Sequence, residues 1–209
     1  MSDCVFPLVF PDYLISVPRP SIKLDIPDFL PFDDIVEDFL DDKTAQLPDL
    51  GHAGVLFIAD QGNRGATKYY EYGRYRSDRG ETRRRPMPNC RFIDGRPELK
   101  SLISVFRQVS FVAGQRGRVN SVFIETPGKF YKVLDYAKRR VQENKNQKRK
   151  PYNIINNSCI HFVMSVVGAA GIRHESSFTD ARPISYINGL QENYPDVKYK
   201  SGQLIIEGW

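Results

Sequence analysis

Cysteine, histidine and tryptophan are scarce in this chain of 209 residues, which has three cysteines, three histidines and one tryptophan. Cys4, Cys90 and Cys159 are an odd number without a repeated spacing, so neither a disulfide framework nor a zinc ribbon is indicated. No histidine or cysteine pair has the spacing of metal ligands, which disfavours metal catalysis, and we predict no cofactor. Any chemistry in this chain therefore depends on single nucleophilic or basic side chains.

Long apolar runs are also lacking. No run reaches the roughly 18 residues that a membrane span needs, so no span is predicted. The first 17 residues, MSDCVFPLVFPDYLISV, have no basic region and are interrupted by Pro7 and Pro11, which argues against a secretory signal. We expect a protein made in the cytoplasm without a signal peptide, and export by a machine that reads no cleavable signal stays open.

The length and a hydrophobic content of 41% indicate a folded protein of one domain, or of one domain with an appendage. Residues 1–49 are rich in proline and aspartate, and we predict an N-terminal extension that packs on a core domain of residues 50–209. Within this extension the pattern favours extended chain, followed by a short acidic helix around residues 31–40.

Strands and helices are mixed in residues 50–209. Strands are predicted over residues 51–60 and 66–76, joined as a hairpin, and over residues 118–126. Helices are predicted over residues 97–114, 127–142 and 158–170, the last of which ends at Gly171. Because strands and helices do not alternate regularly, the pattern favours an α+β fold over a doubly wound sheet.

The net charge of +5 is unevenly distributed along the chain. Residues 25–49 are acidic, whereas residues 74–96 hold eight arginines and residues 138–150 form a second basic run. Such a run forms a solvated face or attracts a polyanion, for example nucleic acid or bacterial cell wall. The mixture of tyrosine and arginine after residue 68 could stack bases, but no known nucleic-acid motif accompanies it. We therefore predict no nucleic-acid partner.

Cys159 is the candidate nucleophile. The predicted helix places Cys159 in its first turn, with Asn157 or Ser158 as the cap. Unsatisfied N–H groups and the helix dipole favour negative charge there, which lowers the pKa of a thiol. The same N–H groups can stabilise the oxyanion that forms on an attacked carbonyl. The alternative is a cysteine that only packs near the core.

A thiolate nucleophile needs a base, and three histidines compete for this role. His161 lies about 200° around the helix from Cys159, so we expect a packed or capping side chain. His174 follows the end of the helix and is a weaker candidate. His52 opens a predicted strand between two glycines that leave room for a substrate backbone, and we predict it as the base.

Glu71, on the strand that follows His52, is the candidate for a third catalytic residue. A carboxylate there can accept the imidazole N–H, fix the tautomer and stabilise the imidazolium. The register of the hairpin cannot be read from the sequence. The alternative is an exposed ion pair between Glu71 and a nearby arginine such as Arg74 or Arg76.

Three motifs in this order, GHAGVL, YYEYG and NNSCIHFV, resemble the permuted branch of the NlpC/P60 papain-like superfamily. The third is also similar to the NCEHF block of lecithin:retinol acyltransferase-like proteins, although here Ser158 separates the asparagine from the cysteine. The resemblance covers about residues 50–170. It implies a papain-like fold with a central antiparallel sheet and a cysteine-bearing helix, in which Cys159, His52 and Glu71 are catalytic and Asn157 and Ser158 serve the oxyanion site or helix cap.

A basic cysteine hydrolase of this size resembles the cell-wall-degrading effectors that type VI secretion systems deliver. The resemblance implies cleavage of an amide bond in peptidoglycan stem peptides or cross-links, in the periplasm of a target cell. It also implies an immunity protein and a secretion-apparatus protein as partners. A cysteine acyltransferase or thioesterase, and a protease or deamidase toxin directed at proteins, remain alternatives.

Overall fold

The computed structural model describes residues 2–18, 44–47, 51–61, 65–75, 79–172 and 182–209. Its main feature is an eight-stranded sheet with the order β12-β11-β9-β1-β4-β5-β6, in which β10 also pairs with β1. All strand pairs in the described residues are antiparallel. The strands of the sheet are β1 (Asp3–Phe10), β4 (His52–Ala59), β5 (Ala66–Gly73), β6 (Glu81–Arg85), β9 (Val119–Val122), β10 (Ile124–Glu125), β11 (Asp196–Lys200) and β12 (Gln203–Ile206).

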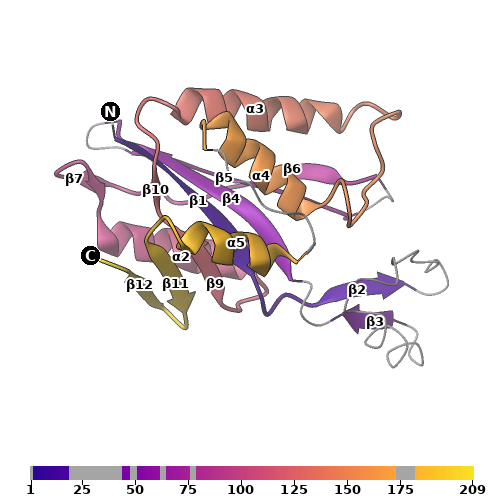
Figure 1. The fold of residues 1–209 in the computed structure, drawn as a ribbon, viewed down its shortest axis with the longest axis horizontal. Helices are drawn as coiled ribbons and strands as arrows, with labels where there is room; N and C mark the ends of the chain where they lie inside the picture. The colour runs from indigo at the N-terminus through magenta and orange to yellow at the C-terminus, as the bar shows by residue number, and fades with distance from the viewer. Residues whose placement is uncertain (1, 19–43, 48–50, 62–64, 76–78, 173–181) are drawn as a thin grey trace.

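Two smaller strand pairs lie outside the main sheet. One joins β2 (Ile15–Pro18) to β3 (Thr44–Leu47), and the other joins β7 (Phe92–Ile93) to β8 (Arg96–Pro97). Figure 1 shows β2 and β3 projecting from one end of the molecule and β7 near the other.

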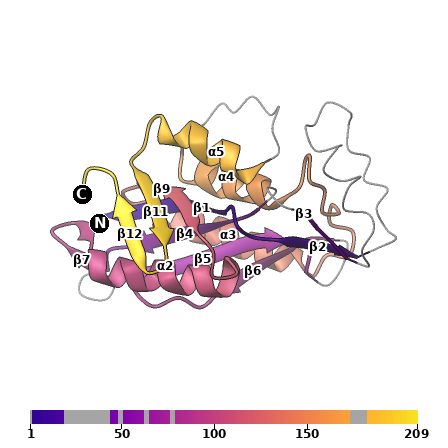
Figure 2. The same cartoon turned by 90° about the horizontal axis from the view of Figure 1, so that it is seen from below.

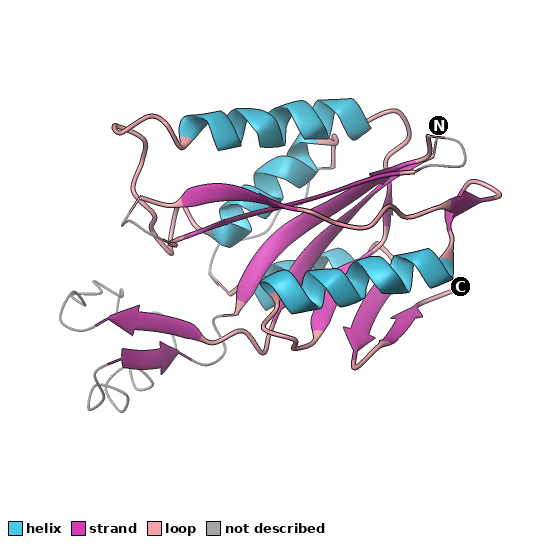
Figure 3. Ribbon diagram, turned by 180° about the vertical axis from the view of Figure 1, so that it is seen from behind, coloured by secondary structure: helices cyan, strands magenta, loops and turns pink. Residues whose placement is uncertain are grey.

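Four helices in the described residues cover the sheet: α2 (Leu99–Ala113), α3 (Phe130–Glu143), α4 (Cys159–Ala169) and α5 (Pro183–Gln191). Figures 1 and 2 show α2 on one side of the sheet and α3, α4 and α5 on the other, and Figure 3 shows α2 from its own side. Period-2 alternation along β1 divides the core accordingly. Val5 and Val9 pack toward α3–α5, while Phe6, Leu8 and Phe10 pack toward α2.

The prediction of an α+β fold is confirmed, and most of the predicted elements after residue 50 are present. The strand predicted over residues 118–126 is interrupted at Phe123, whose N–H donates to the carbonyl of Pro195 rather than to a neighbouring strand of the sheet. Gly171, with φ of +92°, follows the end of α4, as predicted. Helix α5 and the hairpin of β11 and β12 were not predicted.

The N-terminal segment differs from the prediction of an extension that packs on a core domain. Strand β1 lies inside the main sheet, between β4 on one side and β9 and β10 on the other. Pro7, which cannot donate a backbone hydrogen bond, lies opposite the interruption between β9 and β10, so its missing N–H breaks no ladder there. The boundary predicted at residue 50 therefore does not separate the sheet from an appendage. The acidic helix predicted around residues 31–40 lies outside the described residues.

None of the described helices is both long enough and apolar enough to cross a bilayer.

Candidate active site

Cys159 is the first residue of α4 and is 5% exposed. Ser158 is the N-cap residue, and its backbone N–H donates to Nδ1 of His161 over 3.4 Å. The Ser158 hydroxyl lies 2.8 Å from the same nitrogen, so His161 takes the place of the glutamate in a capping box. This cap starts the helix at the cysteine, which puts the positive end of the helix dipole next to the thiol.

His52 is the first residue of β4 and is 7% exposed. Its ring stacks on Phe10, with 5.9 Å between the ring centroids, and lies 5.1 Å from the ring of Tyr13. The imidazole lies against the Cys159 side chain, and each of these two groups shifts the pKa of the other; the backbone N–H of Ala53 also acts on the Cys159 thiol. The start of β4 and the start of α4 thus bring the predicted base and nucleophile into contact.

Glu71 lies on β5, in the register that pairs it with Gly54 of β4. His52 and Gly54 share one face of β4, so Glu71 is the diagonal neighbour of His52 on the same face. Nε2 of His52 faces Oε2 of Glu71 at 3.5 Å, which leaves Nδ1 as the ring nitrogen for Cys159. The three predicted catalytic side chains therefore form one chain of contacts.

Gly54 makes room for a group that holds Glu71 in place. The hydroxyl of Tyr69 donates to Oε2 of Glu71 over 3.0 Å. A Cβ atom built on Gly54 would overlap this hydroxyl, so any larger residue would displace the tyrosine. The glycine that the sequence analysis assigned to substrate access thus also allows Tyr69 to approach the carboxylate.

Arg85, on β6, holds the other oxygen of Glu71. Its Nε and Nη2 lie 2.8 and 2.7 Å from Oε1 of Glu71, whose side chain is 1% exposed. The alternative raised from the sequence was an exposed ion pair with Arg74 or Arg76; Glu71 does have an arginine partner, but this partner is Arg85 and the carboxylate is buried. The same carboxylate also faces His52, so the two interpretations are compatible.

The surroundings shift all three side chains toward their charged forms. Burial lowers the pKa of His52, but the neighbouring Cys159 and Glu71 side chains outweigh it and raise this pKa to about 9. Burial raises the pKa of Cys159, but His52, Ala53 and Tyr152 together lower it below its ordinary value. For Glu71, burial is outweighed by His52 and Arg85, and the pKa falls to about 2. These shifts favour the thiolate form of Cys159, the imidazolium form of His52 and the carboxylate form of Glu71.

Tyr152 is a contact of the nucleophile that the sequence analysis missed. The hydroxyl of this partly buried tyrosine interacts with the Cys159 side chain, and its ring stacks on Tyr72 with 5.7 Å between centroids. Tyr152 lies in the loop before α4, where no periodicity distinguishes it from its neighbours. Only the folded loop, tied at Asn153 and Asn157 by two backbone hydrogen bonds, brings it to the thiol.

The other predicted residues have structural partners or lie outside the described chain. Nδ2 of Asn157 donates to the Tyr72 hydroxyl and to the Pro151 carbonyl, which anchors the loop before α4. His161 belongs to the helix cap, in agreement with its expected capping role. His174 lies outside the described residues.

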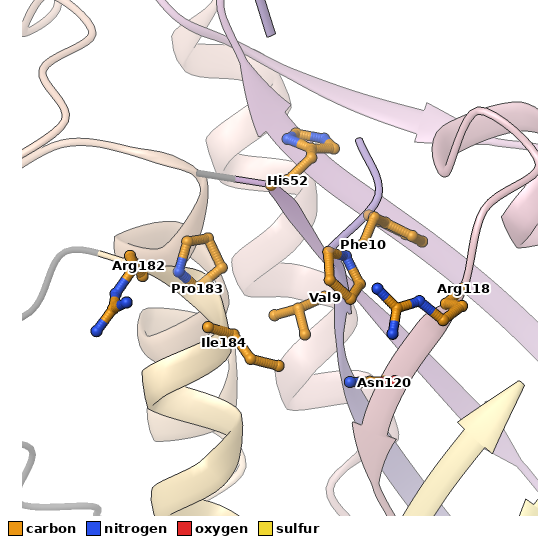
Figure 4. A pocket seen from close by; sticks show the side chains of 10 residues that line it. Val9, Phe10, His52, Arg118, Asn120, Arg182, Pro183 and Ile184 are labelled. Atoms are coloured by element: carbon orange, nitrogen blue, oxygen red, sulfur yellow. The ribbon is translucent and has the colours of Figure 1, made fainter. Parts of the chain in front are cut away.

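A cavity of about 290 Å³ adjoins His52. It is lined by Val9, Phe10, Pro11, Gly51, His52, Arg118, Asn120, Arg182, Pro183 and Ile184. Figure 4 shows the imidazole at one end of this cavity, with the start of α5 along one side and β1 and β9 along the other. Across the described ranges of the chain, no group of three His, Cys, Asp or Glu side chains is placed to hold a metal ion.

Comparison with known proteins identifies the family. The profile described as "Type VI secretion system effector TseH-like" matches residues 5–175. The chain belongs to this TseH-like effector family. Among solved structures, it is similar to the crystal structure of the type VI secretion system effector TseH, with 27% sequence identity and a TM-score of 0.77. The alignment covers 99% of this chain and 98% of that one.

No curated protein matches the chain. Membership of the TseH-like family supports the expectation of an effector toxin that is secreted into target cells. An immunity protein and a component of the secretion apparatus are the partners that this role implies.

Proposed function

We propose that this TseH-like effector is a cysteine hydrolase that cleaves an amide bond in peptidoglycan stem peptides or cross-links of the target cell. One observation carries the proposal: the buried contacts from Cys159 through His52 to Glu71 at the N-terminus of α4. The order of these residues in the chain and their placement on a sheet and a helix match the resemblance to permuted NlpC/P60 papain-like enzymes.

The reaction begins with attack of the Cys159 thiolate on the carbonyl carbon of the scissile amide. The oxyanion lies at the first turn of α4, where backbone N–H groups and the helix dipole stabilise negative charge. The His52 imidazolium gives its proton to the leaving amine as the C–N bond breaks, which leaves a thioester on Cys159. Neutral His52 then takes a proton from water, whose oxygen attacks the thioester and releases the acid and the thiolate.

Glu71 keeps the imidazole oriented and stabilises its positive charge through both steps. Arg85 and Tyr69 in turn hold the carboxylate, and neither touches the reacting atoms in this scheme. The net charge of +5 and the secretion of the family's effectors into target cells support an anionic wall polymer as the substrate. The same thiolate could transfer acyl groups or act on proteins. Identification of the reaction products therefore distinguishes these substrates from peptidoglycan.

The test is digestion of purified sacculi, with identification of the released fragments by mass spectrometry. Wild type should release fragments that carry a new amine and a new carboxylate, whereas Cys159→Ala should release none while melting like a folded protein. Cys90→Ala is the matched control, because Cys90 is a buried thiol without the His52 contact. Equal release by wild type and Cys159→Ala would refute the mechanism, and intact sacculi with folded wild type would refute the substrate.

A further inference from the structure

The cavity beside His52 has one polar side and one apolar side. Figure 4 shows Pro183 and Ile184 facing Val9, Arg118 and Asn120 across the cavity, while the guanidinium of Arg182 points away from it. His52 lines the cavity but Cys159 does not. The cavity therefore extends from the histidine side of the catalytic pair.

The histidine side is where a leaving group must lie. In the proposed reaction His52 transfers its proton to the amine that departs, so the amine half of the substrate has to lie within hydrogen-bonding reach of the imidazole. The acyl half stays attached to the sulfur at the N-terminus of α4. A cavity that includes His52 without the nucleophile is thus positioned for the leaving-group half.

Arg118 is held in a fixed orientation at this cavity. Its Nε and Nη2 both donate to the carboxylate of Asp12, at 2.9 and 2.6 Å to Oδ1, and its backbone N–H donates to Oδ2 at 2.8 Å. Gly117 allows this close approach, because a Cβ atom there would lie 2.8 Å from Cβ of Asp12. Asp12 occupies the Nε–Nη2 edge of the guanidinium, which leaves the Nη1 edge for a ligand.

The charges around the cavity favour an anion. Arg118 extends its guanidinium toward the cavity, and the described residues that line the cavity include no aspartate or glutamate. Helix α5 starts here with Pro183 in its first turn, and its N-cap residue makes no side-chain capping bond, so the positive end of the helix dipole adds to the effect. An arginine that is oriented in advance binds a carboxylate at a lower entropic cost than a free one.

We infer that this cavity is the leaving-group subsite and that Arg118 binds a free carboxylate carried by the amine half of the substrate. The inference rests on the proposed hydrolase function and narrows its substrate to peptides with an acidic leaving group. Asp12 is then a positioning residue for Arg118, and Asn120 lies beside it as a neutral polar neighbour.

The test compares two substrates and three variants. The substrates are soluble muropeptides released from sacculi by a muramidase, and the same muropeptides after their free carboxylates have been converted to amides. Wild type should cleave the acidic substrate with a kcat/KM about ten- to a hundredfold higher, the size expected for one charge-assisted contact. Arg118→Gln should raise KM for the acidic substrate about tenfold, leave kcat within about twofold, and abolish the preference. Arg118→Lys should keep part of the preference for the acidic substrate.

Arg91→Gln is the matched control, because Arg91 is also an exposed arginine with a two-bond contact to one carboxylate, that of Glu98. It should leave both substrates unaffected. Equal effects of Arg118→Gln on the acidic and amidated substrates, or no effect on either, would overturn the subsite while the hydrolase function stands.

Binding separates the subsite from catalysis. In calorimetry, Cys159→Ala should bind the acidic muropeptides, and adding Arg118→Gln should weaken that binding about tenfold or more. Equal affinities of the two proteins would overturn the subsite. Failure of folded wild type to cleave either substrate, with the affinity difference intact, would overturn the hydrolase function instead.

Discussion

Replacing Glu71 by glutamine removes a buried charge and nearly preserves the shape of the side chain. Glu71 is 1% exposed, accepts hydrogen bonds from Tyr69 and Arg85, and faces Nε2 of His52 at 3.5 Å. In the proposed mechanism its carboxylate holds the imidazolium in place. Glutamine can still accept a hydrogen bond, but it no longer stabilises the positive charge on His52.

The expected size of the effect follows from these contacts. A hydrogen bond to a charged group contributes about 1.5–3 kcal/mol, so Glu71→Gln should lower turnover roughly ten- to a hundredfold. Glu71→Ala also leaves Tyr69 and Arg85 without an acceptor and should lower turnover further. Breaking a buried ion pair costs about 3–5 kcal/mol, but the Arg85 side chain is 31% exposed, so we expect a loss of about 2 kcal/mol in stability. This loss corresponds to a fall of roughly 4–8 °C in Tm.

Turnover on sacculi and a thermal melt of each variant measure the two effects separately. Glu98→Gln is the control. Glu98 pairs with the exposed Arg91 and has no part in the proposed mechanism, so this substitution should leave turnover and Tm near wild type. Wild-type turnover by folded Glu71→Ala would remove Glu71 from the mechanism and leave a Cys–His dyad.

Three further predictions concern the neighbours of the thiolate. His52→Ala should lose several orders of magnitude in rate. His161→Ala should lower Tm, because the helix cap is lost, and should keep turnover in the folded fraction. The reverse result would exchange the roles of the two histidines. Tyr152→Phe should lower turnover about tenfold and raise the pKa of Cys159, and an unchanged pH profile would count against the contact. In wild type, kcat/KM should rise as Cys159 ionises below its ordinary pKa and fall as His52 loses its proton near pH 9. A profile that still rises above pH 9 would contradict the imidazolium.

The sequence was sufficient to propose Cys159, His52 and Glu71, because each depends on local signals. A polar cap before an apolar helix marks the position of Cys159, and glycines beside a strand mark that of His52. The contact between His52 and Glu71 depends on the register of β4 and β5, which only the folded hairpin defines. Arg85 was not predicted as a partner of Glu71 for the same reason, since it comes from a third strand.

The position of β1 inside the main sheet could not be predicted from the sequence, because the effect of Pro7 depends on which strands lie beside it. A proline inside a short apolar run normally argues against a central strand. Pro7 is tolerated because the strand beside β1 is interrupted between β9 and β10 opposite this residue. This arrangement joins segments far apart in the sequence, so the local pattern does not reveal it. Helix α5 was missed because its nine residues carry a weak apolar periodicity, and it gains its stability by packing on β1 and β9.

The state of the Cys159 thiol can be measured without any knowledge of the substrate. The rate of alkylation by iodoacetamide, followed at each cysteine by mass spectrometry across pH, reports the thiolate fraction of each thiol. The contact with His52 predicts that Cys159 reacts at neutral pH far faster than Cys4 and Cys90, whose pKa values burial raises, and that His52→Ala removes this advantage. If Cys159 reacts no faster than the other two in wild type, or equally fast in His52→Ala, it is not an activated nucleophile.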